Sequence, residues 1–115
     1  MQSLGEQIRE LRENAEWPQR KLAHELDMDV AVLSRIENEN KFPKKRITDI
    51  IQKVSELFEK SEDELKNMYF GDEISEMLLY ESNYKEILKI SEAKINYRRQ
   101  KQSTQSNLKF SDESN

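Results

Sequence analysis

Residues 18 to 38, PQRKLAHELDMDVAVLSRIEN, place two short helical patterns on either side of a very short connection. The apolar residues of the two patterns recur at helical spacing: Leu22, Ala23, Leu26, Leu33 and Ile36. A proline suits the first position of a helix, and Asp29 is a good cap for the second one. Because only Asp27 to Asp29 separate them, the stretch predicts two helices that pack directly against each other.

The rest of the chain contains little that would interrupt a helix. Its 115 residues include two glycines and two prolines, and Glu, Lys, Leu, Gln and Arg are frequent, so the composition favours an all-α fold. Apolar periodicity predicts further helices over residues 4–14, 45–59 and, in one or two pieces with a break near Ser82 and Asn83, residues 72–99. Ser3 before Glu6 and Ser61 before Glu64 have the form of capping boxes.

The composition changes after Phe70, which divides the chain into three parts. Residues 1–70 contain the short helices, and residues 71–101 form an amphipathic helical extension. Residues 102–115, QSTQSNLKFSDESN, are polar and mostly without periodicity, so we expect a disordered tail.

Several classes of protein are disfavoured by the composition. Without cysteine there is no disulfide framework and no thiolate metal site, and His24 is the only histidine. No Gly-rich phosphate loop or G-x-S-x-G motif is present. We therefore expect a protein with no catalytic residues, no metal and no cofactor. The chain has no apolar run of about 20 residues and no secretory signal, so we expect a cytoplasmic protein without a membrane segment.

The charges allow one local basic surface. The net charge of −4 argues against a protein that coats nucleic acid by bulk charge. Residues 41–46, KFPKKR, nevertheless carry four positive charges. On the helix predicted over Val30–Asn38, the side opposite the core carries Val30, Ala31, Ser34 and Arg35.

Two helices joined by a tight turn, the second with an outward polar edge, form a helix-turn-helix. Residues 4–65 resemble the DNA-binding domain of the Cro and phage-repressor group, the XRE family. The resemblance rests on Q-x-x-L-A at residues 19–23, S-R-I-E at residues 34–37, Met28, Pro43, and the late Leu57, Ser61 and Leu65. It implies a five-helix lambda-repressor-like domain that binds double-stranded DNA, usually as a homodimer, with the helix Val30–Asn38 in the major groove.

The resemblance also implies a role for individual residues. Base edges would be read by Val30, Ala31, Ser34 and Arg35, where a guanidinium can bond guanine O6 and N7 together and a serine can donate or accept. Phosphates would be held by Gln19, Asn38, Lys41, Lys44, Lys45 and Arg46. Arg12 and Glu37 match a buried ion pair that fixes the angle of the recognition helix. The family often has glycine, suited to positive φ, where this chain has Glu16 and Glu39.

These observations predict a dimeric transcriptional regulator, a repressor or autoregulator. A phage-like repressor, a controller of a restriction–modification system and an antitoxin all fit. The alternative is a protein-interaction module or antitoxin that acts mainly through its C-terminal helices. The apolar stripe over residues 72–99 could pack on the first domain, pair with a second copy or bind another protein, and we expect dimerisation first.

Overall fold

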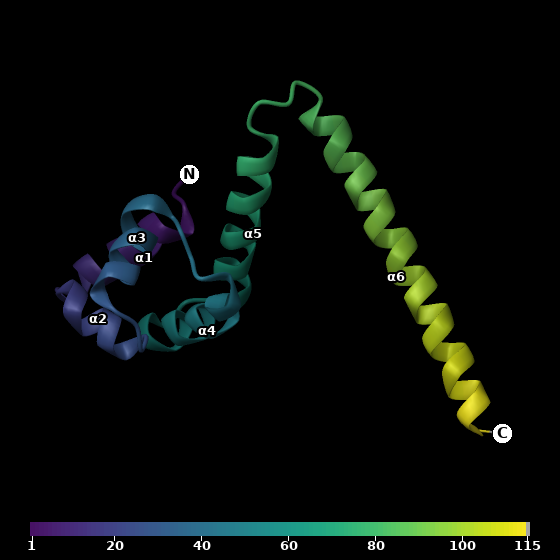
Figure 1. Cartoon of the computed structure of the whole chain (residues 1–115), viewed down its shortest axis with the longest axis horizontal. Coiled ribbons are helices and arrows are strands. Elements are labelled where there is room, and N and C mark those ends of the chain that lie inside the picture. The colour runs from purple at the N-terminus through teal and green to yellow at the C-terminus, as the bar shows by residue number, and fades with distance from the viewer. Residues whose placement is uncertain (115) are drawn as a thin grey trace. The chain divides into compact units, whose positions relative to one another are not determined.

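The computed structural model describes the backbone of residues 1–114 and the side chains of residues 1–103. All regular structure in that range is helical (Figure 1), which confirms the all-α prediction. The elements are α1 Leu4–Asn14, α2 Gln19–Glu25, α3 Val30–Glu39, the 3-10 helix η1 Lys44–Arg46, α4 Ile47–Phe58, α5 Glu62–Leu78 and α6 Tyr84–Ser114. The chain forms two units, Met1–Met77 and Leu78–Asn115, and no helix of the described residues is long and apolar enough to cross a membrane.

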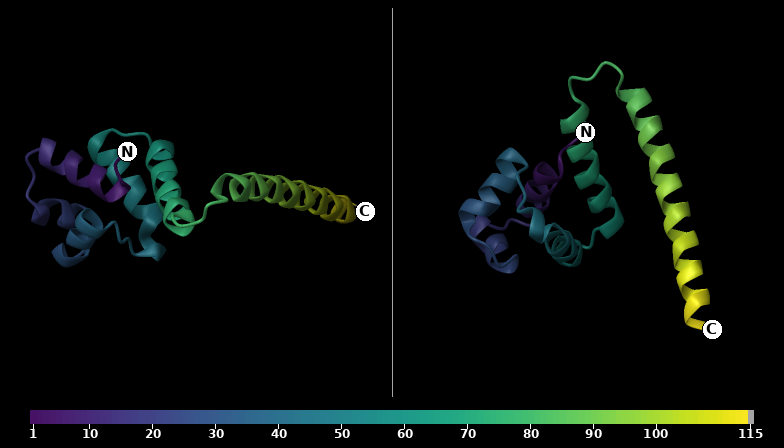
Figure 2. Two further views of the ribbon diagram at one scale, coloured as in Figure 1. Left: turned by 90° about the horizontal axis from the view of Figure 1, so that it is seen from above. Right: turned by 45° about the vertical axis from the view of Figure 1, so that its right-hand side comes forward.

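The first unit encloses one hydrophobic core, around which α1 to α5 are arranged in both views of Figure 2. Each of α1 to α4 contributes side chains to it with an exposed fraction below 2%: Leu4, Ile8, Leu22, Leu26, Leu33, Ile36, Ile50 and Val54. They include Leu22, Leu26, Leu33 and Ile36, which the sequence placed at helical spacing. Burial of their apolar surface is the main term that holds the short helices together, since helices this short are marginal alone.

The helix starts follow the predicted caps. The Oγ of Ser3 accepts a hydrogen bond from the backbone N–H of Glu6 at 3.1 Å, and the Oγ of Ser61 accepts one from that of Glu64 at 3.2 Å. Asp29 is the N-cap of α3, but its side chain makes no capping bond. Two of the three predicted caps therefore act through their side chains.

The helix that begins after Ser61 is longer than expected. It is α5, and it continues through Phe70, where the sequence indicated a boundary. Two contacts join α5 to the rest of the first unit. Tyr69 is buried, with its ring 5.9 Å from that of Phe42. The carboxylate of Asp72 accepts a hydrogen bond from the backbone N–H of Leu4 at 2.8 Å.

The second unit consists mainly of α6, and the chain between Leu78 and Tyr84 contains the expected break near Ser82. The helix continues to Ser114, although the sequence led us to expect a disordered tail from residue 102. No glycine or proline follows Gly71, so no residue in this stretch opposes continuation of the helix strongly. Residue 115 of that predicted tail lies outside the described residues.

Candidate nucleic-acid interface

The two faces of α3 have opposite environments. Leu33 and Ile36 are fully buried against the core. On the other side, Val30, Ala31 and Arg35 are exposed and Ser34 is half-buried. The four residues that the sequence suggested as base readers therefore lie together on the side of α3 that faces away from the core.

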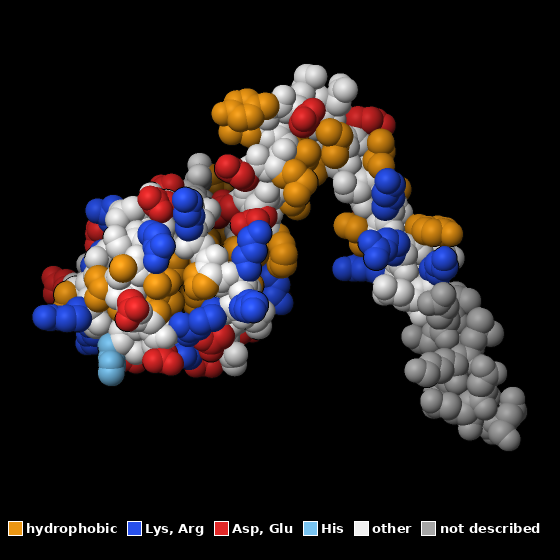
Figure 3. Space-filling view, in the orientation of Figure 1, with side chains coloured by type: hydrophobic (Ala, Val, Ile, Leu, Met, Phe, Trp, Pro, Cys, Tyr) orange, Lys and Arg blue, Asp and Glu red, His pale blue; other side chains and the backbone are white. Residues whose placement is uncertain are grey.

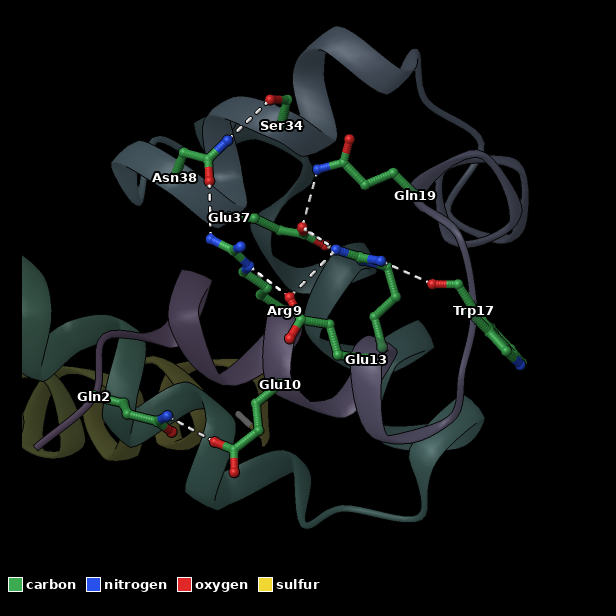
Figure 4. Close-up of polar contacts among 10 residues, drawn as sticks. Gln2, Arg9, Glu10, Glu13, Trp17, Gln19, Ser34, Glu37 and Asn38 are labelled. Atoms are coloured by element: carbon green, nitrogen blue, oxygen red, sulfur yellow. Dashed lines mark hydrogen bonds and ion pairs between the residues drawn. The ribbon is translucent and has the colours of Figure 1, made fainter.

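A buried carboxylate on α3 holds the orientation of this helix relative to α1 and α2. Glu37 accepts hydrogen bonds from Arg12 Nε at 2.8 Å and Arg12 Nη2 at 3.0 Å, and its side chain has an exposed fraction of 0%. Gln19 Nε2 donates to the same carboxylate at 3.0 Å (Figure 4). Arg12 also donates to the carbonyl of Trp17 at 2.8 Å. One side chain of α3 is thus bonded to both α1 and α2.

The N-terminus of α1 lies very close to the end of α3, and the sequence analysis did not identify the residues responsible. A Cβ on Gly5 would lie 2.0 Å from the carbonyl oxygen of Ile36, so this contact requires glycine. The backbone N–H of Gly5 donates to Asn40 Oδ1 at 2.8 Å, and Asn40 Nδ2 donates to Asp72 at 3.2 Å. A glycine within a helical pattern is the sequence signal for such a close approach.

The backbone geometry corrects one expectation drawn from the resemblance. Glu16 has a φ of 58°, as the glycine at that family position suggested. Glu39 instead is the last residue of α3, and the positive φ of 55° falls on Asn40. Asparagine tolerates the left-handed conformation better than glutamate, so α3 ends without a strained acidic residue.

The residues predicted to hold phosphates fall into three groups. Lys41, Lys44 and Lys45 are exposed in the loop after α3 and in η1. The loop is anchored by Phe42, whose ring packs edge-on against Tyr69. Lys41, Phe42 and Pro43 line a shallow pocket together with Val32 and Arg35 of α3. Lys41 and Arg35 of the outward face of α3 therefore lie on one surface, and Lys44 and Lys45 follow in η1.

Arg46 differs from these lysines because its guanidinium is engaged within the fold. It donates to the carbonyls of Leu26 at 2.6 Å and Asp27 at 2.8 Å, and to Asp49 at 2.7 Å. The bond from Arg46 lowers the pKa of the Asp49 carboxyl below its ordinary value. Arg46 thus closes the C-terminal end of α2, and its geometry does not support the predicted phosphate contact.

The two amide side chains predicted to hold phosphates also have partners within the fold. Gln19 is bonded to Glu37, as described above. Asn38 Oδ1 accepts from Arg9 Nη1 at 3.3 Å, and Asn38 Nδ2 donates to Ser34 Oγ at 3.1 Å. Both amides therefore brace α3, and each keeps N–H capacity for a further acceptor.

Residues 8–65 match a protein family described as Helix-turn-helix, HTH_3. The match covers half of the chain and includes α2, α3 and the connection between them. The chain belongs to this helix-turn-helix family. It is an XRE-type, DNA-binding regulator, and its family is one of DNA-binding domains rather than of enzymes.

No curated protein and no solved structure matches the chain. Among the described residues of this helix-turn-helix protein, no group of three or more His, Cys, Asp or Glu side chains is arranged to hold a metal ion.

Proposed function

We propose that this helix-turn-helix protein binds specific operators in double-stranded DNA as a homodimer and acts in the cytoplasm as a transcriptional repressor or autoregulator. The observation that carries the proposal is the division of α3 into a fully buried face and an outward face with Arg35 and its neighbours. A major groove admits one helix, and the residues of its first turns reach base edges. Arg35 is the side chain that contributes most to base recognition, by donating to O6 and N7 of a guanine.

Affinity comes from a separate set of side chains. Lys41 lines a pocket with Arg35 of α3, Lys44 and Lys45 follow in η1, and all three are exposed, which suits them to phosphate oxygens. Such contacts orient the protein on DNA and depend on salt, but they do not distinguish sequences. Gln19 and Asn38 add contacts from amides that the fold already holds in place.

Dimerisation is supported by apolar surface that the first and second units each leave exposed. On α5 these side chains are Phe70, Ile74 and Met77; on one side of α6 they are Tyr84, Leu88 and Ile95, whereas the exposed Ile90 and Tyr97 lie on the opposite side. In Figure 3, apolar and basic side chains lie next to each other along the described part of α6. An exposed stripe of this kind marks an interaction surface, and a two-fold operator needs two recognition helices about 34 Å apart.

The charges of the two helices favour association between copies. On α5 the acidic residues are Glu62, Asp63, Glu64, Asp72, Glu73 and Glu76, against Lys66 alone. On the described side chains of α6 the basic residues are Lys85, Lys89, Lys94, Arg98, Arg99 and Lys101, against Glu86 and Glu92. Pairing the acidic helix of one copy with the basic helix of another would cover both stripes and balance both charges.

The DNA-binding proposal is tested by selecting bound sequences from a random duplex library with the purified full chain. A palindrome with half-sites one helical turn apart is the expected result. On the selected site, Arg35→Ala should weaken binding by about 1–3 kcal/mol and relax one base position. Lys45→Ala should weaken all sequences alike and reduce the salt slope by about 1. If neither substitution changes binding, α3 is not the recognition helix.

Dimerisation is tested separately by sedimentation of the full chain. Leu88→Glu combined with Ile95→Glu should give monomers, because both substitutions place charge in the apolar stripe of α6. Ala93→Glu adds a charge on another side of the same helix and serves as the control. If folded protein enriches no DNA sequence but its oligomers depend on Leu88 and Ile95, the interaction-module alternative replaces the regulator.

A further inference from the structure

Three side chains form a hydrogen-bonded chain from α1 to the base-reading face of α3. Arg9 Nη1 donates to Asn38 Oδ1 at 3.3 Å, and Asn38 Nδ2 donates to Ser34 Oγ at 3.1 Å (Figure 4). The guanidinium is oriented by a second bond, from Arg9 Nε to Glu13 Oε1 at 2.7 Å. Arg9 is not among the residues to which the helix-turn-helix pattern assigned a role.

The direction of each bond in this chain is fixed by chemistry. An arginine side chain can only donate hydrogen bonds, whereas an asparagine amide has one accepting and one donating end. With Arg9 on one side, the amide oxygen of Asn38 must face α1 and its NH2 group must face Ser34. The Ser34 hydroxyl then accepts a bond through its oxygen, and its own proton remains available for an acceptor outside the protein.

We propose that Arg9 is a positioning residue that, through Asn38, makes Ser34 a hydrogen-bond donor toward DNA. The inference rests on the proposed function, since it specifies how one base reader works. A serine alone donates or accepts and discriminates little. Held as a donor, Ser34 favours bases that present acceptors in the major groove, namely guanine O6 or N7, adenine N7 and thymine O4. It favours the amino group of cytosine less, because one of the two lone pairs of its oxygen already accepts from Asn38.

The experiment compares base preferences, position by position, among sequences selected by the full chain and its variants. Ser34→Ala identifies the position that Ser34 reads. Arg9→Leu frees the amide to turn over, so the preference at that position should fall by about 2- to 10-fold, the value of one hydrogen bond. Arg9→Lys keeps a side chain that only donates and should retain the preference. In the Ser34→Ala background, Arg9→Leu should cause no further change there.

A substitution that reverses the direction of the chain gives a sharper readout. In Asn38→Asp the carboxylate only accepts, so the Ser34 hydroxyl donates inward and presents its oxygen to the DNA. The preference at the Ser34 position should then move toward bases with an amino group, cytosine or adenine. Relative base frequencies are compared because the added negative charge weakens binding to every sequence.

The matched control is Lys45→Leu, which removes one positive charge from the proposed phosphate-binding surface. It should lower affinity for all sequences and leave every base preference unchanged. If Arg9→Leu behaves like this control, Arg9 is a phosphate contact and the inference is wrong. If the wild-type chain enriches no sequence at all, the proposed function fails instead. Equal thermal midpoints of the variants would show that the changes in base preference do not come from loss of folded protein.

Discussion

Replacing Glu37 with alanine should destabilise the fold far more than replacing an exposed glutamate. The side chain of Glu37 has an exposed fraction of 0% and that of Arg12 has 11%. Removing one partner of a buried ion pair leaves the other charge desolvated, which costs about 3–5 kcal/mol. Arg12 keeps its bond to the Trp17 carbonyl and lies 3.9 Å from Glu13, so we expect the lower end, about 3 kcal/mol.

The assay is urea denaturation of the full chain, followed by the fluorescence of Trp17. Trp17 is the only tryptophan, and its ring lies 5.3 Å from that of Phe58 and 4.3 Å from Lys21 Nζ. Its emission therefore reports on the packing of the first unit and not on the helicity of α6. A loss of about 3 kcal/mol corresponds to more than a 100-fold change in the folding equilibrium constant.

A double variant separates the free-energy cost of leaving one buried charge unpaired from the net stabilisation that the ion pair provides. Arg12→Leu with Glu37→Met replaces both charges by apolar groups of similar size, and we expect it to cost less than Glu37→Ala alone. Glu10→Ala, at an exposed position of α1, is the control for loss of a glutamate. The reasoning is refuted if Glu37→Ala costs no more stability than this control. It is also refuted if the stability loss of the double variant equals the sum of the losses of Arg12→Leu and Glu37→Met alone.

Three further outcomes follow from particular contacts. Gly5→Ala should cost at least about 2 kcal/mol in the same urea assay, because its Cβ would meet the backbone oxygen of Ile36. Arg46→Ala should lower stability by about 1–2 kcal/mol, since two carbonyls lose a charged donor, and it should leave the salt slope of DNA binding unchanged where Lys45→Ala reduces it. The hydrogen bond from Arg46 lowers the pKa of Asp49 in the fold from its ordinary 3.8. The ionised carboxylate therefore stabilises the fold above about that pH, and this stabilisation is lost as the pH falls through the lowered pKa. On acidification, the thermal midpoint of Asp49→Asn should accordingly decline less than that of the wild-type chain.

The helices themselves could be predicted from the sequence because the signals involved are local. The apolar residues of α1 to α4 repeat every three or four positions, and the bonds from Ser3 and Ser61 to the start of their helices span three residues. The outward position of Arg35 follows from the same periodicity once Leu33 and Ile36 are assigned to the core. The Arg12–Glu37 pair was expected only from the family resemblance.

The tertiary structure decided what the charged and polar side chains do. Arg46 and Lys45 are adjacent in one basic cluster, yet Arg46 bonds to carbonyls 19 and 20 positions away, whereas Lys45 is exposed. Asp72 lies beyond the expected domain boundary, but it bonds Leu4 across 68 residues and so extends the first unit along α5. Periodicity and capping act within about one helical turn. The partner of a long polar side chain depends on which helix ends meet in space, and in this chain core packing brings them together.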